Sequence, residues 1–315
     1  MDRAKELDPR RALLAVLLIG ATVLVPFALS ATGHLGPARE LAGRYRMVTD
    51  ADGMLLFCTG LPVTVGDQFI GHSNEIYSIT RVERERATAV PVMVERNVPD
   101  LEQQLVVIED PPLGRAAMPL GVLSRTVVIY HTHTDESYEP TDGRPFITAR
   151  GGVVAVGDSL RRALEGVGYI VVHDQTPHHP HDALAYARSR RTATSNLKHK
   201  PYLMFDIHRD SGPAETYVVR VEGEPASQVL LVVGRQNPLL TANLSLARKI
   251  KSVADAAYPA LVKGIFLAMG DYNQDLDPGA LLLEVGTEKV PREMCERSMG
   301  FFARVIARAF GAPGV

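Results

Sequence analysis

Two histidines and a glutamate follow an apolar stretch near the middle of the chain. The segment TVVIYHTHTDESYE, residues 126–139, passes from β-branched residues to His131, His133 and Glu136 within a few positions. A turn between His133 and Glu136 would aim an imidazole nitrogen and a carboxylate oxygen at one point. His208, in the later segment FDIHRD, would complete a His2Glu set that leaves a fourth zinc position open for water. The spacing therefore predicts a zinc site.

The choice between His131 and His133 as the first zinc ligand depends on strand geometry. Strand alternation places both side chains on the same face. We expect His133 to be the ligand, because it lies nearer the end of the strand, and His131 to orient ligands or bind substrate. An HxxE pair also arises by chance as an ordinary structural pair, so the zinc hypothesis depends on His208 joining it.

A second glutamate, Glu284, has the setting of a general base. It follows three leucines in LLLEVG, where desolvation would raise the pKa of its carboxyl unless a cation offsets burial. Beside zinc-activated water, a glutamate can take a proton during attack and return it to the leaving amine. The alternative is a structural ion pair with Arg209 or Arg292. Asp206 alternates with His208 and points the same way, and we expect it to hydrogen-bond the second nitrogen of a ligating histidine.

Other polar residues are expected to surround the ligands or to contact substrate. Arg209 follows His208 and belongs to this outer group. The amides of Asn273 and Gln274 precede the strand of Glu284, and they either bind a peptide or glycan backbone or build the turn. Two prolines indicate that HDQTPHHPHD is a solvated loop, with substrate or metal binding as alternatives. Its four histidines are His173, His178, His179 and His181.

The elements that must position these residues follow a strand–helix pattern. Their apolar periodicity predicts an α/β fold, in which a mostly parallel twisted sheet carries helices on both faces. Ligands collect beyond the carboxyl ends of the strands in such sheets, which is where the motifs above lie. Strands are expected at 125–130, 170–174, 202–208 and 280–287, a hairpin at 215–234, and helices at 153–169, 182–199, 238–258 and 291–310.

We place this domain at 123–315. Upstream of it, the sequence pattern indicates a small β domain, a linker and an apolar N-terminal segment. Short segments rich in Val, Ile, Tyr and Thr predict a small β domain over 44–98. Residues 99–122 contain Pro-Pro and lose periodicity, so we expect a linker there. The uncharged apolar run within 12–33 is long enough to cross a bilayer as a transmembrane signal anchor, and two preceding arginines keep residues 1–11 cytoplasmic. A cleaved signal peptide is the alternative.

Bulk composition excludes several classes of protein. The 315 residues are 46% hydrophobic and 22% charged, with a formal net charge of -2, which is ordinary for a globular protein. No basic excess indicates a nucleic-acid partner. Cys58 and Cys295 lie far apart and outside any CxxC spacing, so neither a disulfide framework nor a thiolate metal site is expected.

The motifs also resemble a known family. YHTHTDESY, FDIHRDSG, GIFLAMGDYNQDLDPGALLLEVGT and the helix VVAVGDSLRRALEGVGY are similar to segments of the stage II sporulation protein P family, within the zinc-dependent N-acetylmuramoyl-L-alanine amidases. The resemblance spans roughly residues 123–312. It implies an amidase fold and zinc bound by His133, Glu136 and His208, with Glu284 as the catalytic glutamate.

The same resemblance implies a substrate and partners. The substrate would be peptidoglycan, cut at the amide between N-acetylmuramic acid and L-alanine, with stem-peptide cross-links as a second target. The site of action would be the septal space between the membranes during spore engulfment. The implied partners are the glycan-cleaving sporulation protein D, a lytic transglycosylase, and a membrane scaffold.

Two other functions fit the same residues. A zinc carboxypeptidase also uses HxxE, a later histidine and a glutamate base, but it requires an arginine that grips a terminal carboxylate; Arg209 and Arg235 are the candidates. A non-catalytic wall-binding module would use the same cleft without hydrolysis. The reaction products and the zinc content distinguish these alternatives.

Overall fold

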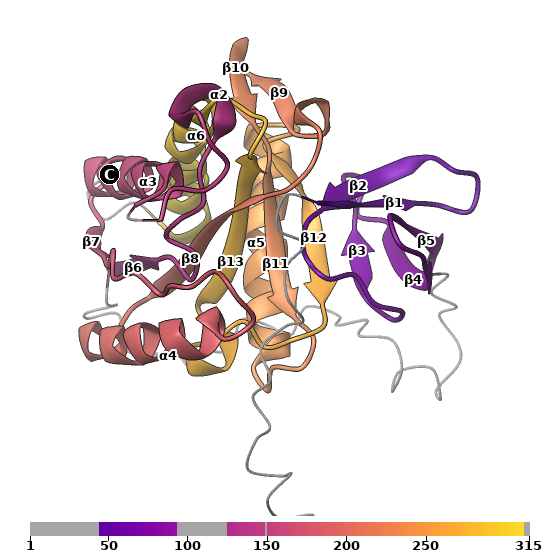
Figure 1. Cartoon of the computed structure of the whole chain (residues 1–315). Coiled ribbons are helices and arrows are strands. Elements are labelled where there is room, and N and C mark those ends of the chain that lie inside the picture. Colours follow the sequence, from indigo (N-terminus) through magenta and orange to yellow (C-terminus); the bar gives the residue numbers. More distant parts are fainter. Residues whose placement is uncertain (1–43, 93–124, 149, 312–315) are drawn as a thin grey trace, which may run out of the picture. The chain divides into compact units, whose positions relative to one another are not determined.

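The computed structural model describes residues 44–92, 125–148 and 150–311, which form an α/β structure around one large sheet (Figure 1). Eleven strands join in the order β2-β1-β5-β4-β3-β12-β11-β13-β8-β6-β7. Their bounds are β1 (Arg46–Thr49), β2 (Leu55–Thr59), β3 (Gln68–Ile70), β4 (Ile76–Val82), β5 (Arg86–Pro91), β6 (Thr126–Tyr130), β7 (Ile170–His173), β8 (Leu203–Asp210), β11 (Val229–Gly234), β12 (Val262–Ala268) and β13 (Ala280–Thr287). A separate hairpin consists of β9 (Val218–Val221) and β10 (Glu224–Ser227).

The sheet is mixed. Strands β7, β6, β8 and β13 run parallel to one another, and β11 runs parallel to β12. The pair β11 and β13 is antiparallel, as are β12 and β3 and most pairs among β1 to β5. The expected parallel pairing therefore holds within the strands that carry the motifs, and the carboxyl ends of β6, β8 and β13 meet at one edge.

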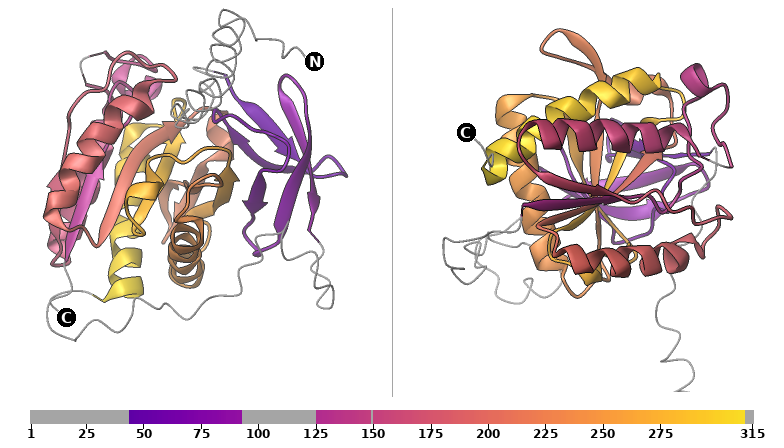
Figure 2. Two further views of the ribbon diagram at one scale, coloured as in Figure 1. Left: turned by 90° about the horizontal axis from the view of Figure 1, so that it is seen from below. Right: turned by 90° about the vertical axis from the view of Figure 1, so that its left-hand side faces the viewer.

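Helices cover both faces of the sheet, as the sequence predicts. The right-hand view of Figure 2 shows α3 and α6 on one side of the strands and α4 on the other. Helix α6 packs against α3 and α5, and α5 also packs against β11 and β12. The helix bounds are α2 (Glu139–Asp142), α3 (Gly152–Gly166), α4 (Ala185–Asn196), α5 (Leu240–Ala257) and α6 (Arg292–Phe310), and the 3-10 turns are η1 (Leu197–His199), η2 (Ala214–Thr216) and η3 (Gln274–Leu276).

Alternation along β8 divides the core between the two faces. Phe205 and Ile207 belong to the large apolar core that includes residues of α3 and α6. Met204 packs instead in a smaller apolar cluster that includes Ala193 of α4. Because side chains two residues apart share a face, His208 lies on the same face as Met204. Asp206 and His208 therefore emerge on the α4 side.

The β-rich segment before the motifs contributes to the same sheet. Strand β3 pairs with β12 in antiparallel register, with Ile70 opposite Ile265. The sequence pattern predicts neither strand, because β3 has only three residues and the segment of β12 has no clear alternation. The domain boundaries remain a prediction, but the described residues of both segments share hydrogen-bonded strands.

Three predicted segments lie outside the described residues. These are the cytoplasmic tail 1–11, the anchor 12–33 and the linker 99–122. Within 44–92, 125–148 and 150–311, none of the helices combines the length and the apolar character that crossing a membrane requires.

Candidate metal centre

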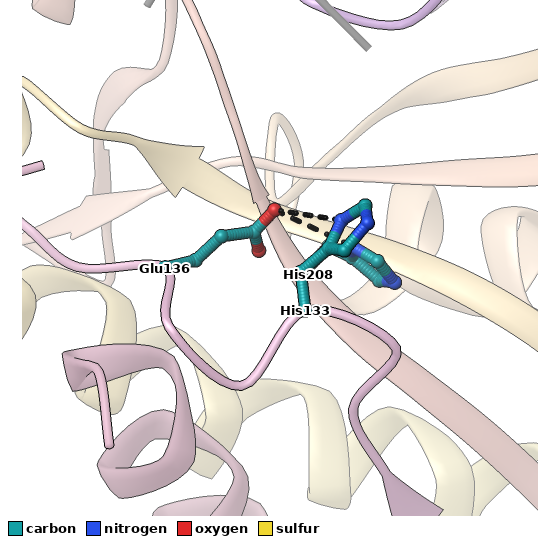
Figure 3. Close-up of side chains that lie close together, drawn as sticks. All are labelled: His133, Glu136 and His208. Carbon is teal, nitrogen blue, oxygen red and sulfur yellow. Dashed lines mark ion pairs between the residues drawn. The ribbon is translucent and has the colours of Figure 1, made fainter. Parts of the chain in front are cut away.

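His133 and Glu136, from the turn after β6, converge with His208, which lies two residues before the end of β8 (Figure 3). Oε1 of Glu136 lies 3.3 Å from Nδ1 of His133 and 3.5 Å from Nδ1 of His208. One ligand atom from each of the three residues lies within 4.8 Å of the other two. All three side chains are buried, with exposed fractions of 3%, 1% and 0%. The predicted His2Glu group is therefore assembled in space.

The turn after β6 brings Glu136 next to His133. The Glu136 amide lies 3.4 Å from the carbonyl of His133, which closes the turn between the two side chains. The start of α3 supports this turn, because the amide of Gly151 donates to the carbonyl of Thr134 at 2.7 Å. A Cβ atom at Gly151 would come within 2.0 Å of the Glu136 carbonyl oxygen, so glycine is required for this approach.

The geometry of the group fits zinc. Tetrahedral zinc with bonds of about 2.05 Å has ligand atoms separated by about 3.3 Å along each edge. The two nitrogen–oxygen distances, 3.3 and 3.5 Å, are close to this value. Two imidazoles and one carboxylate are also the donor set of known catalytic zinc sites, which leave one position for water or substrate.

The electrostatics of the group favour a positive charge at its centre. Burial by itself lowers the pKa of His208, but Asp206 and Glu136 outweigh it and raise the pKa well above its ordinary value. Burial likewise raises the pKa of Glu136, but the imidazoles of His208 and His133 hold the pKa below its ordinary range. Two buried carboxylates thus flank His208, and a bound cation would offset their negative charge.

His131 does not join the cluster, and the expectation that it shares a face with His133 is wrong. Strand β6 ends at Tyr130, so strand alternation stops before either histidine. The His131 ring turns toward α3, where Nδ1 lies 2.8 Å from the Ile207 carbonyl and Nε2 lies 2.8 Å from Nε2 of His173. Because a carbonyl only accepts, neutral His131 carries its proton on Nδ1 and accepts one bond from His173. Burial lowers the pKa of His131 to about 3.

Asp206 and Arg209 support the cluster from outside. Asp206 Oδ1 lies 3.1 Å from Nε2 of His208, on the side of the ring opposite Glu136, so the histidine that Asp206 was expected to contact is His208. The backbone amide of Arg209 donates to Oε2 of Glu136 at 2.9 Å. The Arg209 guanidinium donates to the carbonyls of Ser137 and Pro145, so it braces the loop that carries Glu136.

Glu284 lies next to His208 on the adjoining strand. The parallel register of β13 and β8 pairs these two residues, so their side chains emerge on one face from neighbouring strands. Glu284 is 2% exposed. The alternative partners named from the sequence have contacts elsewhere: Arg209 braces the Glu136 loop, and Arg292 pairs with Asp142 and Glu296.

The amides of Asn273 and Gln274 are used inside the fold. Asn273 Nδ2 donates to the Tyr186 carbonyl and to Ser189, which ties the η3 turn to α4. Gln274 accepts from the amide of Gly234 and donates to the Val232 carbonyl, which ties the same turn to β11. These contacts fit the turn-building alternative, while a substrate contact stays a prediction.

The histidine-rich loop packs against the cluster, so the expectation of a solvated loop is wrong for two of its members. His178 is buried and bonds to the His131 carbonyl and to Thr192. His181 stacks on the ring of His133 with centroids 3.8 Å apart, and its Nδ1 lies 3.1 Å from Oδ1 of Asp135. The loop thus returns over the cluster, which local sequence does not reveal.

An aromatic wall beside the cluster was not predicted. Tyr186 of α4 lies parallel to the His208 ring at 6.1 Å and edge-on to the His133 ring at 5.7 Å. In the sequence, Tyr186 reads as an ordinary apolar position of a helix, and no motif distinguishes it. Its role depends on the packing of α4 over the end of β8.

Fold and site together define an α/β protein with a buried His2Glu group of the composition that zinc hydrolases use. The chain belongs to the stage II sporulation protein P (SpoIIP) family, which it matches over residues 84–307. It is 31% identical over 206 residues to stage II sporulation protein P of Bacillus subtilis strain 168. That match covers 59% of this chain and 51% of the Bacillus protein, so the chain spans about half the length of its relative.

Solved structures with a similar arrangement include two amidases. The CwlD amidase of Clostridioides difficile, in complex with the GerS lipoprotein, superposes with a TM-score of 0.42 and 10% identity over 58% of this chain and 97% of its own. The amidase Ami1 of Mycobacterium smegmatis has a TM-score of 0.40 and 16% identity over 59% of this chain and 97% of its own. Likeness at this level supports no functional conclusion by itself.

Proposed function

We propose that this chain is a zinc-dependent N-acetylmuramoyl-L-alanine amidase acting on peptidoglycan. The observation that carries the proposal is the convergence of His133, Glu136 and His208, with Glu284 on the strand beside His208. When bound, zinc would activate a water molecule and polarise the amide carbonyl. Membership of the sporulation protein family supports a role in wall remodelling.

The residues of the chain have separate tasks in this proposal. Glu284 accepts the proton of the attacking water and returns it to the leaving amine of L-alanine. Asp206 holds the far nitrogen of His208 and so fixes which ring nitrogen faces the zinc position. The Arg209 amide orients Glu136 in the same way. Burial of the whole group strengthens each of these electrostatic contacts.

The proposal extends to location and partners. We propose that the segment 12–33 anchors the chain in the membrane, with the catalytic residues on the outer side, in the septal space of the engulfing cell. Cleavage of stem-peptide cross-links, and joint action with the sporulation protein D transglycosylase and a membrane scaffold, belong to the same proposal. They rest on the family resemblance of the motifs.

The carboxypeptidase alternative has less support. It requires an arginine directed at the terminal carboxylate of a peptide. Arg209 donates to the Ser137 and Pro145 carbonyls, and Arg235 pairs with the buried carboxylate of Asp67 at 2.9 Å. Each candidate is therefore engaged in holding the fold.

A substitution of the proposed base tests the function. Glu284→Gln keeps the shape and removes the basic oxygen, so it should retain zinc while hydrolysis falls by about 100-fold or more. Release of muropeptides from purified wall gives the activity, and elemental analysis gives the zinc content. Glu215→Gln, on the short η2 turn, is the matched control and should hydrolyse normally.

The reaction products decide between the alternatives. Free, intact stem peptides support the amidase, whereas shortened peptides that remain on the glycan support the carboxypeptidase. Full hydrolysis by Glu284→Gln would contradict the base assignment. A purified chain that binds no zinc and ignores chelators would contradict the enzyme proposal as a whole.

A further inference from the structure

The strand that carries His208 ends in a second buried carboxylate. Asp210 lies two residues beyond His208 on the same face and is 2% exposed. Its Oδ1 accepts from the hydroxyl of Thr59 at 3.0 Å, the amide of Gly60 at 2.7 Å and the amide of Ser211 at 2.8 Å. Its Oδ2 accepts from a fourth donor, the Tyr217 hydroxyl, at 2.7 Å.

Two of these four donors come from the β-rich segment near the start of the described chain. Thr59 is the last residue of β2, and Gly60 lies 150 residues before Asp210 in sequence. The contact is also close: a Cβ atom at Gly60 would lie 2.8 Å from Cβ of Ser211. The end of β2 therefore holds the end of β8 by hydrogen bonds and by direct packing.

The residues next to this contact lead to the candidate metal ligands. Ser211 Oγ lies 3.3 Å from Nη1 of Arg209, and the Arg209 amide donates to Glu136. On the other side of Arg209, His208 is itself a candidate ligand. A displacement at the end of β8 would thus reach two of the three ligands, one through the backbone and one through the Arg209 amide.

We propose that Asp210 is a positioning residue through which the β2 end, Thr59 and Gly60, sets the geometry of the metal centre. The β-rich segment then helps to position the candidate metal ligands. This inference rests on the proposed function only in taking the metal to be zinc. It predicts that a change at Thr59, which lies outside the ligand set, alters metal binding.

The test uses the full chain with Thr59→Val, which keeps nearly the same shape and removes the hydroxyl that donates to Asp210 and accepts from the Leu61 amide. Competition with a chromophoric chelator should show about tenfold weaker zinc binding, and the visible spectrum of the cobalt-loaded chain should shift. Thr59→Ser restores the hydroxyl and should recover both properties. Thr80→Val is the matched control, because the Thr80 hydroxyl donates to the Thr88 carbonyl on the neighbouring strand β5 instead of to a residue of β8.

The outcomes separate this inference from the proposed function. A purely structural contact would lower the urea midpoint of Thr59→Val while leaving the cobalt spectrum and zinc affinity of the folded protein unchanged, and that result would overturn the inference. Tyr217→Phe, which removes the donor to Oδ2, provides the same comparison if Thr59→Val does not fold. A wild-type chain without zinc affinity would overturn the proposed function itself.

Discussion

Replacement of Asp206 tests how strongly the outer contact of His208 governs zinc binding. The Asp206 carboxylate is 1% exposed and is contacted by Thr132, His208 and the Tyr130 hydroxyl. The amide and hydroxyl of Thr132 donate at 2.8 and 2.6 Å, and Nε2 of His208 lies at 3.1 Å. With Nε2 held as the donor, the Nδ1 atom that faces Glu136 is left free of its proton and able to bind a metal.

The structure allows two substitutions with different expected magnitudes. In Asp206→Asn the remaining carbonyl oxygen can still accept at the Oδ1 position, and the Thr132 hydroxyl can turn to Ser189, which lies 2.7 Å away. We expect about tenfold weaker zinc binding, from the lost charge. Asp206→Ala removes every contact, so we expect about 100-fold weaker binding, close to 3 kcal/mol. In Asp206→Ala the buried amide of Thr132 also loses the carboxylate that accepts its hydrogen bond, which costs about 1–3 kcal/mol of folding free energy.

Two assays measure these effects separately. Chelator competition gives the zinc dissociation constant, and urea unfolding of the zinc-free chain gives the loss of stability. Asp174→Asn is the matched control, because the Asp174 carboxylate accepts from Thr176 and Asn196 and contacts no candidate ligand. If Asp206→Ala binds zinc within about twofold of the wild type, the outer contact does not orient His208 and the reasoning is refuted.

Two further predictions concern metal removal and pH. Chelation should lower the thermal midpoint, because zinc at 1,000 times its dissociation constant adds about 4 kcal/mol to the unfolding free energy; an unchanged midpoint in a scanning calorimeter would contradict this. Burial lowers the pKa of His173 to about 4. Between pH 6.5 and pH 4 the unfolded chain therefore binds a proton that the folded chain does not. The free energy of unfolding should decrease by up to about 2 kcal/mol as the pH falls through this range. Urea unfolding should show a shallower decline for His173→Gln, and an identical decline would count against the assigned pKa.

The residues next to strand ends could be predicted because their signals are local. An apolar run that stops at ionisable residues identifies a strand end in a parallel sheet, and alternation along β8 places Asp206 on the face of His208. The same rule failed for His131, because β6 ends one residue earlier and the backbone turns there. Alternation is a property of the strand and does not extend into the turn.

The sequence by itself determined the residues of the His2Glu group, the α/β pattern and the family of this chain, because strand periodicity and motif spacing depend on residues close together in the chain. Only the tertiary structure decided that His181 stacks on His133, that Tyr186 forms a wall beside them, and that Thr59 reaches Asp210. These contacts join residues separated by 48 to 151 positions. Such pairings depend on how whole elements pack, which no local pattern of residues specifies.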